Sequence, residues 1–318
     1  MRPSWAGSLF SAASVMTFCK RIYSNDRWLA AYIAYRKRVN DRPRRPAPFT
    51  GQGATTRKRT EQGMEIFVRE SPESDKETIV LYLHGSGYVM QPTWFHWRFF
   101  GRLARELRTE VVMPIYPKAP VHHFGEASEK LIACYRQLLE RKKKARIVVI
   151  GDSSGGAVAL ALTQEAVRLK LPLPERLILI SPLLDSSLRR PEIQEIEQVD
   201  LLQTKKVLRA FGKAWAGGET LTHPAVSPLY GPLSSLPPVS ILIGTRDLLF
   251  PDSAAWVSAV RAAGGEAELL PYERMIHDFP LLPIPEAKHA MKRIAELARQ
   301  SSARSDKGRE SYGVSRID

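Results

Sequence analysis

The segment 146-RIVVIGDSSGGAVALAL-162 decides the fold of this chain. Residues 147–150 are all β-branched and show no polar alternation, which predicts a strand buried on both faces. After a short glycine-rich turn, an apolar and alanine-rich stretch predicts a helix over about 156–170. A strand that passes through a tight turn directly into a helix is typical of the βα units of parallel sheets, so the segment predicts an α/β fold.

Strand and helix patterns alternate on both sides of this segment, and they imply a mostly parallel sheet with helices on both faces. The expected strands are 64–69, 78–83, 110–115, 146–150, 177–181, 239–243 and 267–271, and further helices are expected near 126–143, 252–263 and 286–299. Residues 186–230 contain two helical patterns, 192–199 and 204–216, without a strand. We expect this insertion to cover the edge where the strands end, since insertions there act as lids.

The N-terminal and C-terminal parts of the chain differ from this pattern. Two helices are expected near 5–22 and 25–40, with Ser24 capping the second, and the proline-rich run 42–48 reads as a linker. The tail after about Arg299 is rich in serine and charge, and we expect it to be disordered. The predicted division is therefore a helical cap segment and linker at 1–50, an α/β domain at 51–299 that contains the insertion 186–230, and a tail at 300–318.

Charge is distributed unevenly along the chain. The sequence has 47 Lys/Arg and 33 Asp/Glu, a net charge of +14, but residues 1–59 hold 13 of the basic residues and only 2 acidic ones. The body is nearly balanced, which argues against a nucleic-acid partner. We expect the basic arm to be the solvated face of a covering segment, with loose attachment to an anionic membrane as the alternative.

Targeting signals and cysteine pairs are not evident. Residues 6–18 are fairly apolar but are interrupted by serine and threonine, and no run approaches the roughly 20 apolar residues of a membrane-spanning helix. Cys19 and Cys134 give neither a disulfide framework nor a metal-ligand spacing. The sequence therefore predicts a cytoplasmic protein, and either a monomer or a homodimer is compatible with it.

The turn Gly151-Asp-Ser-Ser-Gly-Gly156 contains a G-x-S-x-G pattern centred on Ser153. A serine on a sharp strand-to-helix turn is held out at the carboxyl edge of the sheet, where its hydroxyl can attack a substrate. The N-terminus of the following helix adds partial positive charge beside a developing oxyanion. We therefore predict that Ser153 is a nucleophile, the alternative being a glycine-rich βα turn with an incidental serine.

A second motif, His84-Gly-Ser-Gly-Tyr88, follows the strand 78–83. Together with Gly151–Gly156, it resembles the HGGG loop and GDSAGG elbow of the hormone-sensitive-lipase-like esterases, and the similarity runs from about residue 77 to 299. The resemblance implies an α/β-hydrolase fold and an oxyanion hole formed by the backbone N–H groups of Ser86, Gly87 and Ser154. Ser86 and Ser154 stand where that family has glycine and alanine, and Ser86 would be strained if its position requires a positive φ.

Chain order in this fold places the general base last, after the acid. His277 is the histidine that follows the last predicted strand on a short turn, whereas His289 lies in a helical pattern and should face solvent. His84 should brace its loop rather than act as a base. The family has H-G-F where this chain has His277-Asp278-Phe279, and we expect the Asp278 side chain to point away from the imidazole.

Asp247 is the predicted acid, because it follows the strand 239–243 and precedes His277 by 30 residues. It would hold the imidazole in the required tautomer. Asp185 and Asp252 are alternatives, although Asp185 reads as a turn residue and Asp252 as a cap of the next helix. Asp152 lies beside Ser153, and a structural hydrogen bond is its expected task.

The resemblance implies hydrolysis of a small-molecule carboxylic ester of short to medium acyl chain through an acyl-enzyme, with no metal or organic cofactor. Two alternatives remain: a lipase recruited to a membrane surface by the basic arm, and a ligand-binding protein of the same fold that has lost catalysis. The aromatic segment 88–97 is compatible with an acyl pocket, a lid contact or the core.

Overall fold

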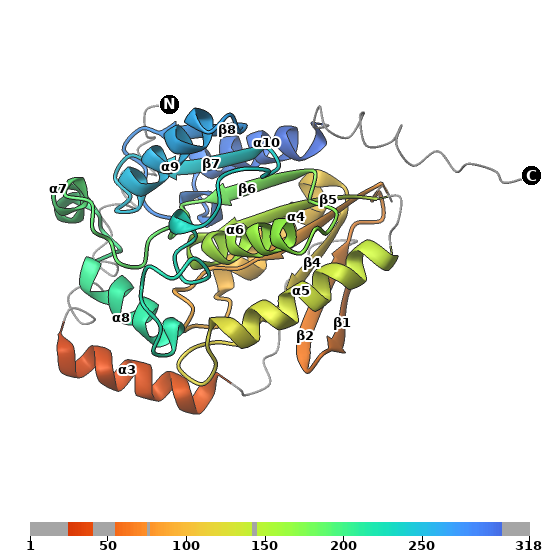
Figure 1. The fold of residues 1–318 in the computed structure, drawn as a ribbon. Coiled ribbons are helices and arrows are strands. Elements are labelled where there is room, and N and C mark those ends of the chain that lie inside the picture. The colour runs from red at the N-terminus through yellow and green to blue at the C-terminus, as the bar shows by residue number, and fades with distance from the viewer. Residues whose placement is uncertain (1–24, 41–54, 75–76, 142–144, 301–318) are drawn as a thin grey trace, which may run out of the picture.

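The computed structural model describes residues 25–40, 55–74, 77–141 and 145–300, and its centre is one eight-stranded sheet (Figure 1). The strand order is β1-β2-β4-β3-β5-β6-β7-β8. The pairs β1–β2 and β2–β4 are antiparallel and the remaining pairs are parallel. The strands are β1 Thr55–Glu61, β2 Met64–Glu70, β3 Thr78–Leu83, β4 Glu110–Pro114, β5 Arg146–Asp152, β6 Arg176–Ile180, β7 Val239–Gly244 and β8 Ala267–Tyr272.

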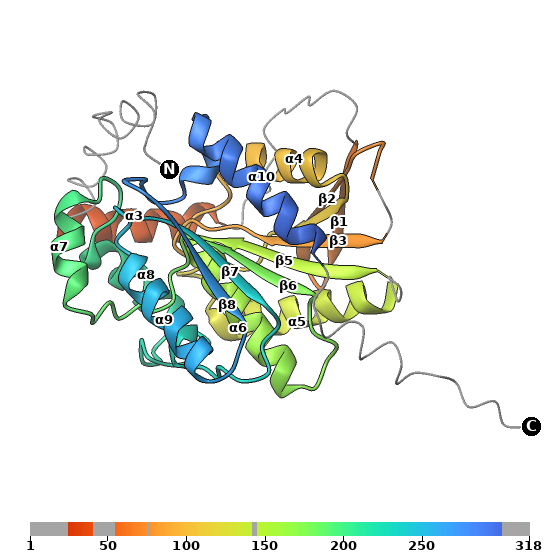
Figure 2. The same ribbon diagram turned by 90° about the horizontal axis from the view of Figure 1, so that it is seen from above.

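Helices cover both faces of the sheet (Figure 2), which confirms the predicted α/β-hydrolase architecture. Helices α4 and α10 lie on one face, and α5, α6 and α9 lie on the other. The described helices are α3 Asp26–Val39, α4 Trp94–Leu107, α5 Phe124–Arg141, α6 Ser153–Arg168, α7 Glu192–Val199, α8 Lys205–Ala216, α9 Phe250–Ala262 and α10 Pro285–Arg299. None of the helices in the described ranges is both long and apolar enough to cross a membrane.

Successive residues of the central strands enter two different hydrophobic layers. In β3, Ile79, Leu81 and Leu83 belong to the layer under α5, α6 and α9, whereas Val80 and Tyr82 belong to the layer under α4 and α10. Side chains of a strand alternate between faces, so a strand with apolar residues at every position must be covered on both sides. This is why continuous apolar runs were sufficient to predict these strands.

Two elements were not predicted. Strand β1 has the sequence TTRKRTE, which lacks apolar residues, and it pairs only with β2 at the edge of the sheet. Helix α4 begins inside the aromatic segment 88–97, at Trp94, and continues to Leu107. Its Trp97, Phe99 and Phe100 are buried in the layer between α4 and the sheet, whereas the preceding Tyr88 is buried on the opposite face.

Helix α3 confirms the second N-terminal helix, but its cap is Asn25 and not Ser24. The Asn25 Oδ1 accepts hydrogen bonds from the backbone N–H groups of Arg27 and Trp28 at 3.0 and 3.3 Å. Asparagine is among the strongest N-cap residues, so it starts the helix one residue later than predicted. The predicted helix at 5–22, the linker at 42–48 and the tail after 300 lie outside the described residues.

The end of α3 is fastened to the loops that follow β3 and β4. The Asn40 Nδ2 donates to the carbonyls of Val89 and Ala119 at 2.9 and 2.8 Å, and Arg36 Nε donates to the same Val89 carbonyl at 3.2 Å. Arg36 also donates to Asn40 Oδ1 at 2.7 Å. These groups are buried, so the N-terminal helix is tied to the body by bonds that water cannot easily replace.

Replacing Asn40 with alanine should therefore destabilise the protein. The Ala119 carbonyl would lose the Asn40 donor, the Val89 carbonyl would keep only Arg36, and the expected loss is about 2 kcal/mol of unfolding free energy. Urea denaturation measures this loss directly. The control Lys37→Ala removes an exposed side chain from the same helix and should change the midpoint little; equal effects of both changes would contradict the anchoring role of Asn40.

Candidate active site

The turn between β5 and α6 holds Ser153 in a strained conformation. Ser153 begins α6 directly after Asp152 and has φ +52°, in the left-handed region that costs a residue with a Cβ about 1–3 kcal/mol. A Cβ on Gly155 would overlap the carbonyl of Leu83, and one on Gly85 would lie 2.9 Å from the Cβ of Ser153. The turn and the loop after β3 therefore touch backbone to backbone, which requires glycine on both sides.

Three predicted residues meet at this turn and form a continuous hydrogen-bonded chain. The His277 Nε2 lies 2.9 Å from Ser153 Oγ, and the His277 Nδ1 lies 3.0 Å from Asp247 Oδ2. All three side chains are buried, and the other Asp247 oxygen accepts the N–H of Leu249 at 3.0 Å. With Nδ1–H donating to Asp247, the neutral imidazole presents a lone pair at Nε2 to the serine hydroxyl.

The alternative acids lie in other surroundings. Asp185 accepts from the Ser187 N–H and hydroxyl and from the Tyr230 hydroxyl, so it is a turn residue as predicted. Asp252 does not cap α9 as predicted, because the helix begins at Phe250 and Asp252 lies within its first turn. Its Oδ1 is 3.0 Å from Arg190 Nε, and burial raises the pKa of Asp252 to about 7.

The expectation that Asp278 points away from the imidazole is wrong. Its Oδ2 lies 3.2 Å from His277 Nε2, the same nitrogen that faces Ser153. Asp278 has φ +51° and ψ +28°, and its N–H donates to Ser181 Oγ at 3.2 Å. The left-handed backbone turns the side chain back onto its neighbour, which an extended backbone would not do. His277 thus has a carboxylate at each ring nitrogen.

These carboxylates change the basicity of the imidazole. Burial by itself lowers the pKa of His277, but the charges of Asp278 and Asp247 more than reverse this and leave the pKa well above its usual value. Burial raises the pKa of Asp278 to about 6, against the lowering effect of the neighbouring imidazole. Above that pH an ionised Asp278 stabilises the imidazolium form.

Asp152 and His84 brace the loop that follows β3, as predicted. Asp152 accepts from the Tyr82 hydroxyl at 2.5 Å and from the Gly85 N–H at 2.9 Å. The ring of His84 donates from Nδ1 to the Gly85 carbonyl at 2.8 Å and stacks on Tyr116. Burial lowers the pKa of His84 well below its usual value, so this histidine stays neutral and structural.

Two further site residues were missed from sequence. His96 on α4 accepts the Thr93 N–H at Nδ1, so its Nε2–H donates to Asp152 at 3.1 Å. Asp200 accepts the Leu248 N–H at 2.8 Å, directly after Asp247, and links the insertion to the acid-bearing loop. Only the pattern Thr93-x-x-His96, a capping box at the start of α4, offered a signal in the sequence.

The predicted oxyanion loop has three successive residues with positive φ: Ser86 at +93°, Gly87 at +64° and Tyr88 at +66°. Ser86 therefore has a positive φ, the conformation in which a serine in place of glycine is strained. The Tyr88 N–H donates to Ser154 Oγ at 3.1 Å, which fastens this loop to the first turn of α6. The N–H groups of Ser86, Gly87 and Ser154 thus belong to two turns held side by side.

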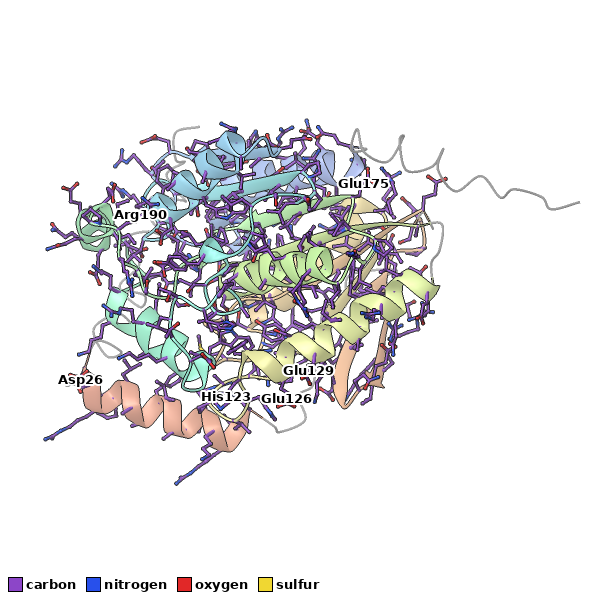
Figure 3. All side chains as sticks on the ribbon, viewed as in Figure 1. Asp26, His123, Glu126, Glu129, Glu175 and Arg190 are labelled. Atoms are coloured by element: carbon purple, nitrogen blue, oxygen red, sulfur yellow. The ribbon has the colours of Figure 1, made fainter. Side chains whose placement is uncertain are left out.

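Helices α3, α7 and α8 lie together at the end of the sheet that carries this site (Figure 1). On α8, Phe211 packs over Gly87, where an added Cβ would come within 2.5 Å of its ring, and Trp215 stacks on Tyr88 with centroids 4.9 Å apart. Asp26, at the start of α3 (Figure 3), pairs with Lys206 of α8 at 2.7 Å. The predicted insertion and the N-terminal helix therefore meet above the loop.

Comparison with known proteins identifies the class. Residues 80–281 match the model of an α/β-hydrolase-fold family. An esterase of Acinetobacter venetianus is 30% identical over 224 residues, 69% of this chain and 74% of that protein. A Staphylococcus aureus protein assigned as an esterase superposes with a TM-score of 0.84 and 30% identity, covering 88% of this chain and 95% of the other. A hormone-sensitive lipase from a metagenome library gives a TM-score of 0.75 at 27% identity, covering 85% and 90%.

The chain therefore belongs to the α/β-hydrolase-fold family. Within that family it is a carboxylic ester hydrolase of the hormone-sensitive-lipase type, which confirms the resemblance drawn from the two glycine motifs. The part of the chain that the structure describes holds no group of three or more His, Cys, Asp or Glu side chains arranged to bind a metal ion.

Asp278→Asn should lower the pKa of His277, because it removes the carboxylate whose charge raises that pKa most. Asparagine also tolerates the left-handed backbone at this position. NMR titration of the His277 ring in a Ser153→Ala background reports the pKa without relying on activity. Glu273→Gln, an exposed charge on the same loop, is the control and should leave the titration unchanged. A titration in Asp278→Asn that is unchanged or moved to higher pH would contradict the assigned role.

Proposed function

We propose that this chain hydrolyses short- to medium-chain carboxylic esters with Ser153 as nucleophile, His277 as general base and Asp247 as the acid that orients the imidazole. The observation that carries the proposal is the hydrogen-bonded chain from Ser153 Oγ through His277 to Asp247, on a strained strand-to-helix turn. Such a chain lets the imidazole take the hydroxyl proton as the oxygen attacks a carbonyl carbon.

The tetrahedral intermediate needs donors for its oxyanion, and we assign these to the N–H groups of Ser86, Gly87 and Ser154. Because the donors are main-chain groups, the serine substitutions at 86 and 154 keep them, and the bond from Tyr88 N–H to Ser154 Oγ supports their alignment. A preorganised donor of this type typically contributes about 10²–10³ in rate. His277 then protonates the leaving alcohol, and the acyl-enzyme is released by a water that the same imidazole activates.

Asp278 sets the condition under which His277 can act as a base. The imidazole accepts the serine proton only when neutral, whereas Asp278 favours the protonated ring. The base form is therefore fully populated only at higher pH than an unperturbed histidine would need. Before attack, Asp278 disfavours the neutral imidazole that the reaction needs. In the tetrahedral intermediate the same carboxylate stabilises the imidazolium, which partly offsets that effect.

The insertion 186–230 and the N-terminal segment form the cap in this proposal, and their packing supports a small acyl site. Phe211 of α8 lies on Gly87 of the oxyanion loop and contacts Tyr32 of α3, with ring centroids 6.4 Å apart. Bulky rings packed on the proposed oxyanion loop favour acyl chains of short to medium length. The substrate in this proposal is a small-molecule ester.

The catalytic assignment predicts a distinct ranking of variants. Ser153→Ala and His277→Ala should lose several orders of magnitude in turnover of p-nitrophenyl butyrate while keeping the fold. Asp247→Asn should be severely impaired, and Asp185→Asn, which removes the charge of a turn carboxylate, much less so. Near-normal turnover in Ser153→Ala would contradict the mechanism. A greater loss in Asp185→Asn than in Asp247→Asn would assign the acid to Asp185.

Acyl-chain preference tests the cap. With p-nitrophenyl esters from C2 to C16, kcat/KM should peak between about C4 and C8, because each buried CH₂ adds about 0.8 kcal/mol only while space remains. Phe211→Ala should move the maximum to longer chains, and Lys213→Ala, exposed on the same helix, should not. A wild-type rate that rises through C16 would favour the alternative, a lipase acting at a membrane surface.

A further inference from the structure

A cavity is lined by residues of α4 and α10. These two helices lie on one face of the sheet (Figure 2), and none of the residues that line the cavity belongs to α8. The cavity volume is about 770 Å³, within the range of small-molecule sites. The walls are one face of α4, one face of α10 and Arg69 of β2. The lining residues are Arg69, Trp97, Arg98, Gly101, Arg102, Arg105, Glu106, Lys288, Met291, Lys292, Ala295, Glu296 and Arg299.

The lining is strongly cationic, with seven basic and two acidic side chains. Both carboxylates are already engaged by arginines: Glu106 pairs with Arg105 at 2.7 Å, and Glu296 pairs with Arg293, outside the cavity, at 3.4 Å. The cavity therefore has an excess of positive charge that its own acidic residues do not neutralise.

Among the described residues, three guanidinium groups that line the cavity form their hydrogen bonds with neutral groups. Arg98 donates to the Leu281 carbonyl at 3.2 Å, and Arg102 donates to the Ala287 carbonyl at 3.2 Å. Arg69 donates to the Thr56 hydroxyl at 3.2 Å, while its buried Nε has no partner among the described residues. Arg69 and Arg102 are only 6% and 9% exposed, so water compensates their charges poorly.

The arginines also oppose one another. Burial lowers the pKa of Arg69, Arg98 and Arg102, and the charge of Arg105 lowers each of them further. Arg98 also lowers the pKa of Arg102, and the Glu106 carboxylate opposes this only in part. A cluster of like charges in a partly buried hollow is unfavourable when it is empty. A bound anion would supply the missing opposite charge, and the planar guanidinium fork matches the oxygens of a phosphate group.

We propose that this cavity binds a phosphate-bearing small molecule, with the phosphate on Arg69, Arg98 and Arg102 and its apolar part against Trp97 and Met291. Lys288 and Lys292 stand exposed on α10 at the cavity and would complete the phosphate shell. Gly101 leaves room at the base: a Cβ there would already touch the Arg69 guanidinium at 3.5 Å. The site lies outside the proposed ester-hydrolysing centre and does not depend on that assignment.

Two sources offer this chemistry, a soluble phosphate ester and the headgroup of an anionic phospholipid. The test is titration calorimetry of the full chain at fixed salt with inorganic pyrophosphate, and co-sedimentation with phosphatidylglycerol or phosphatidylcholine vesicles. Ser153→Ala, which should bind like wild type, separates this binding from any ester hydrolysis.

We expect saturable binding of pyrophosphate that Arg69→Gln weakens about tenfold or more, the usual effect of losing a charge-assisted hydrogen bond. Lys292→Glu should weaken it similarly, and because its side chain is exposed this variant guards against loss of fold. The control Arg136→Glu makes the same charge change on exposed α5 surface and should stay within about twofold. Binding confined to phosphatidylglycerol vesicles, with the same variant dependence, would assign the lipid headgroup. Absence of binding to either probe, or equal weakening by Arg136→Glu, would overturn the proposal.

Discussion

The backbone contact between the turn after β5 and the loop after β3 is the constraint on which the site depends. Gly85 and Gly155 allow these two segments to touch, and the contact leaves Ser153 at φ +52°. The sheet stabilises this strain, because β3 and β5 are neighbours paired over six residues and buried on both faces. Without that rigid base, a left-handed serine would relax and its hydroxyl would leave the imidazole.

Buried carboxylates form a second common element of the site. Asp152 holds the oxyanion loop, Asp247 holds the histidine, and Asp200 holds the loop that carries Asp247. Each accepts hydrogen bonds from N–H or hydroxyl donors, which is the condition for keeping a carboxylate away from water. Asp278 differs, since its Oδ1 has no partner among the described residues and its other oxygen faces His277. Its charge therefore acts mainly on the imidazole of His277.

The histidine loop is held from both sides of the sheet. On the side of the site it carries His277 and Asp278, and from behind Arg98 and Arg102 donate to the carbonyls of Leu281 and Pro280. The arginines of the cationic cavity thus also contact the segment that follows the proposed base.

Sequence by itself determined most of the fold and the proposed triad. Short β-branched apolar runs predicted the buried central strands, and chain order together with strand ends selected Ser153, Asp247 and His277. The edge strand β1 was not predicted, because its side chains are mostly exposed and its sequence has no apolar pattern. Tertiary structure alone decided the orientation of Asp278, the contact of Asp200 with the acid loop and the grouping of Arg69 with α4 and α10. Those features depend on backbone dihedrals and on packing between segments far apart in the chain, for which no local pattern of residues is required.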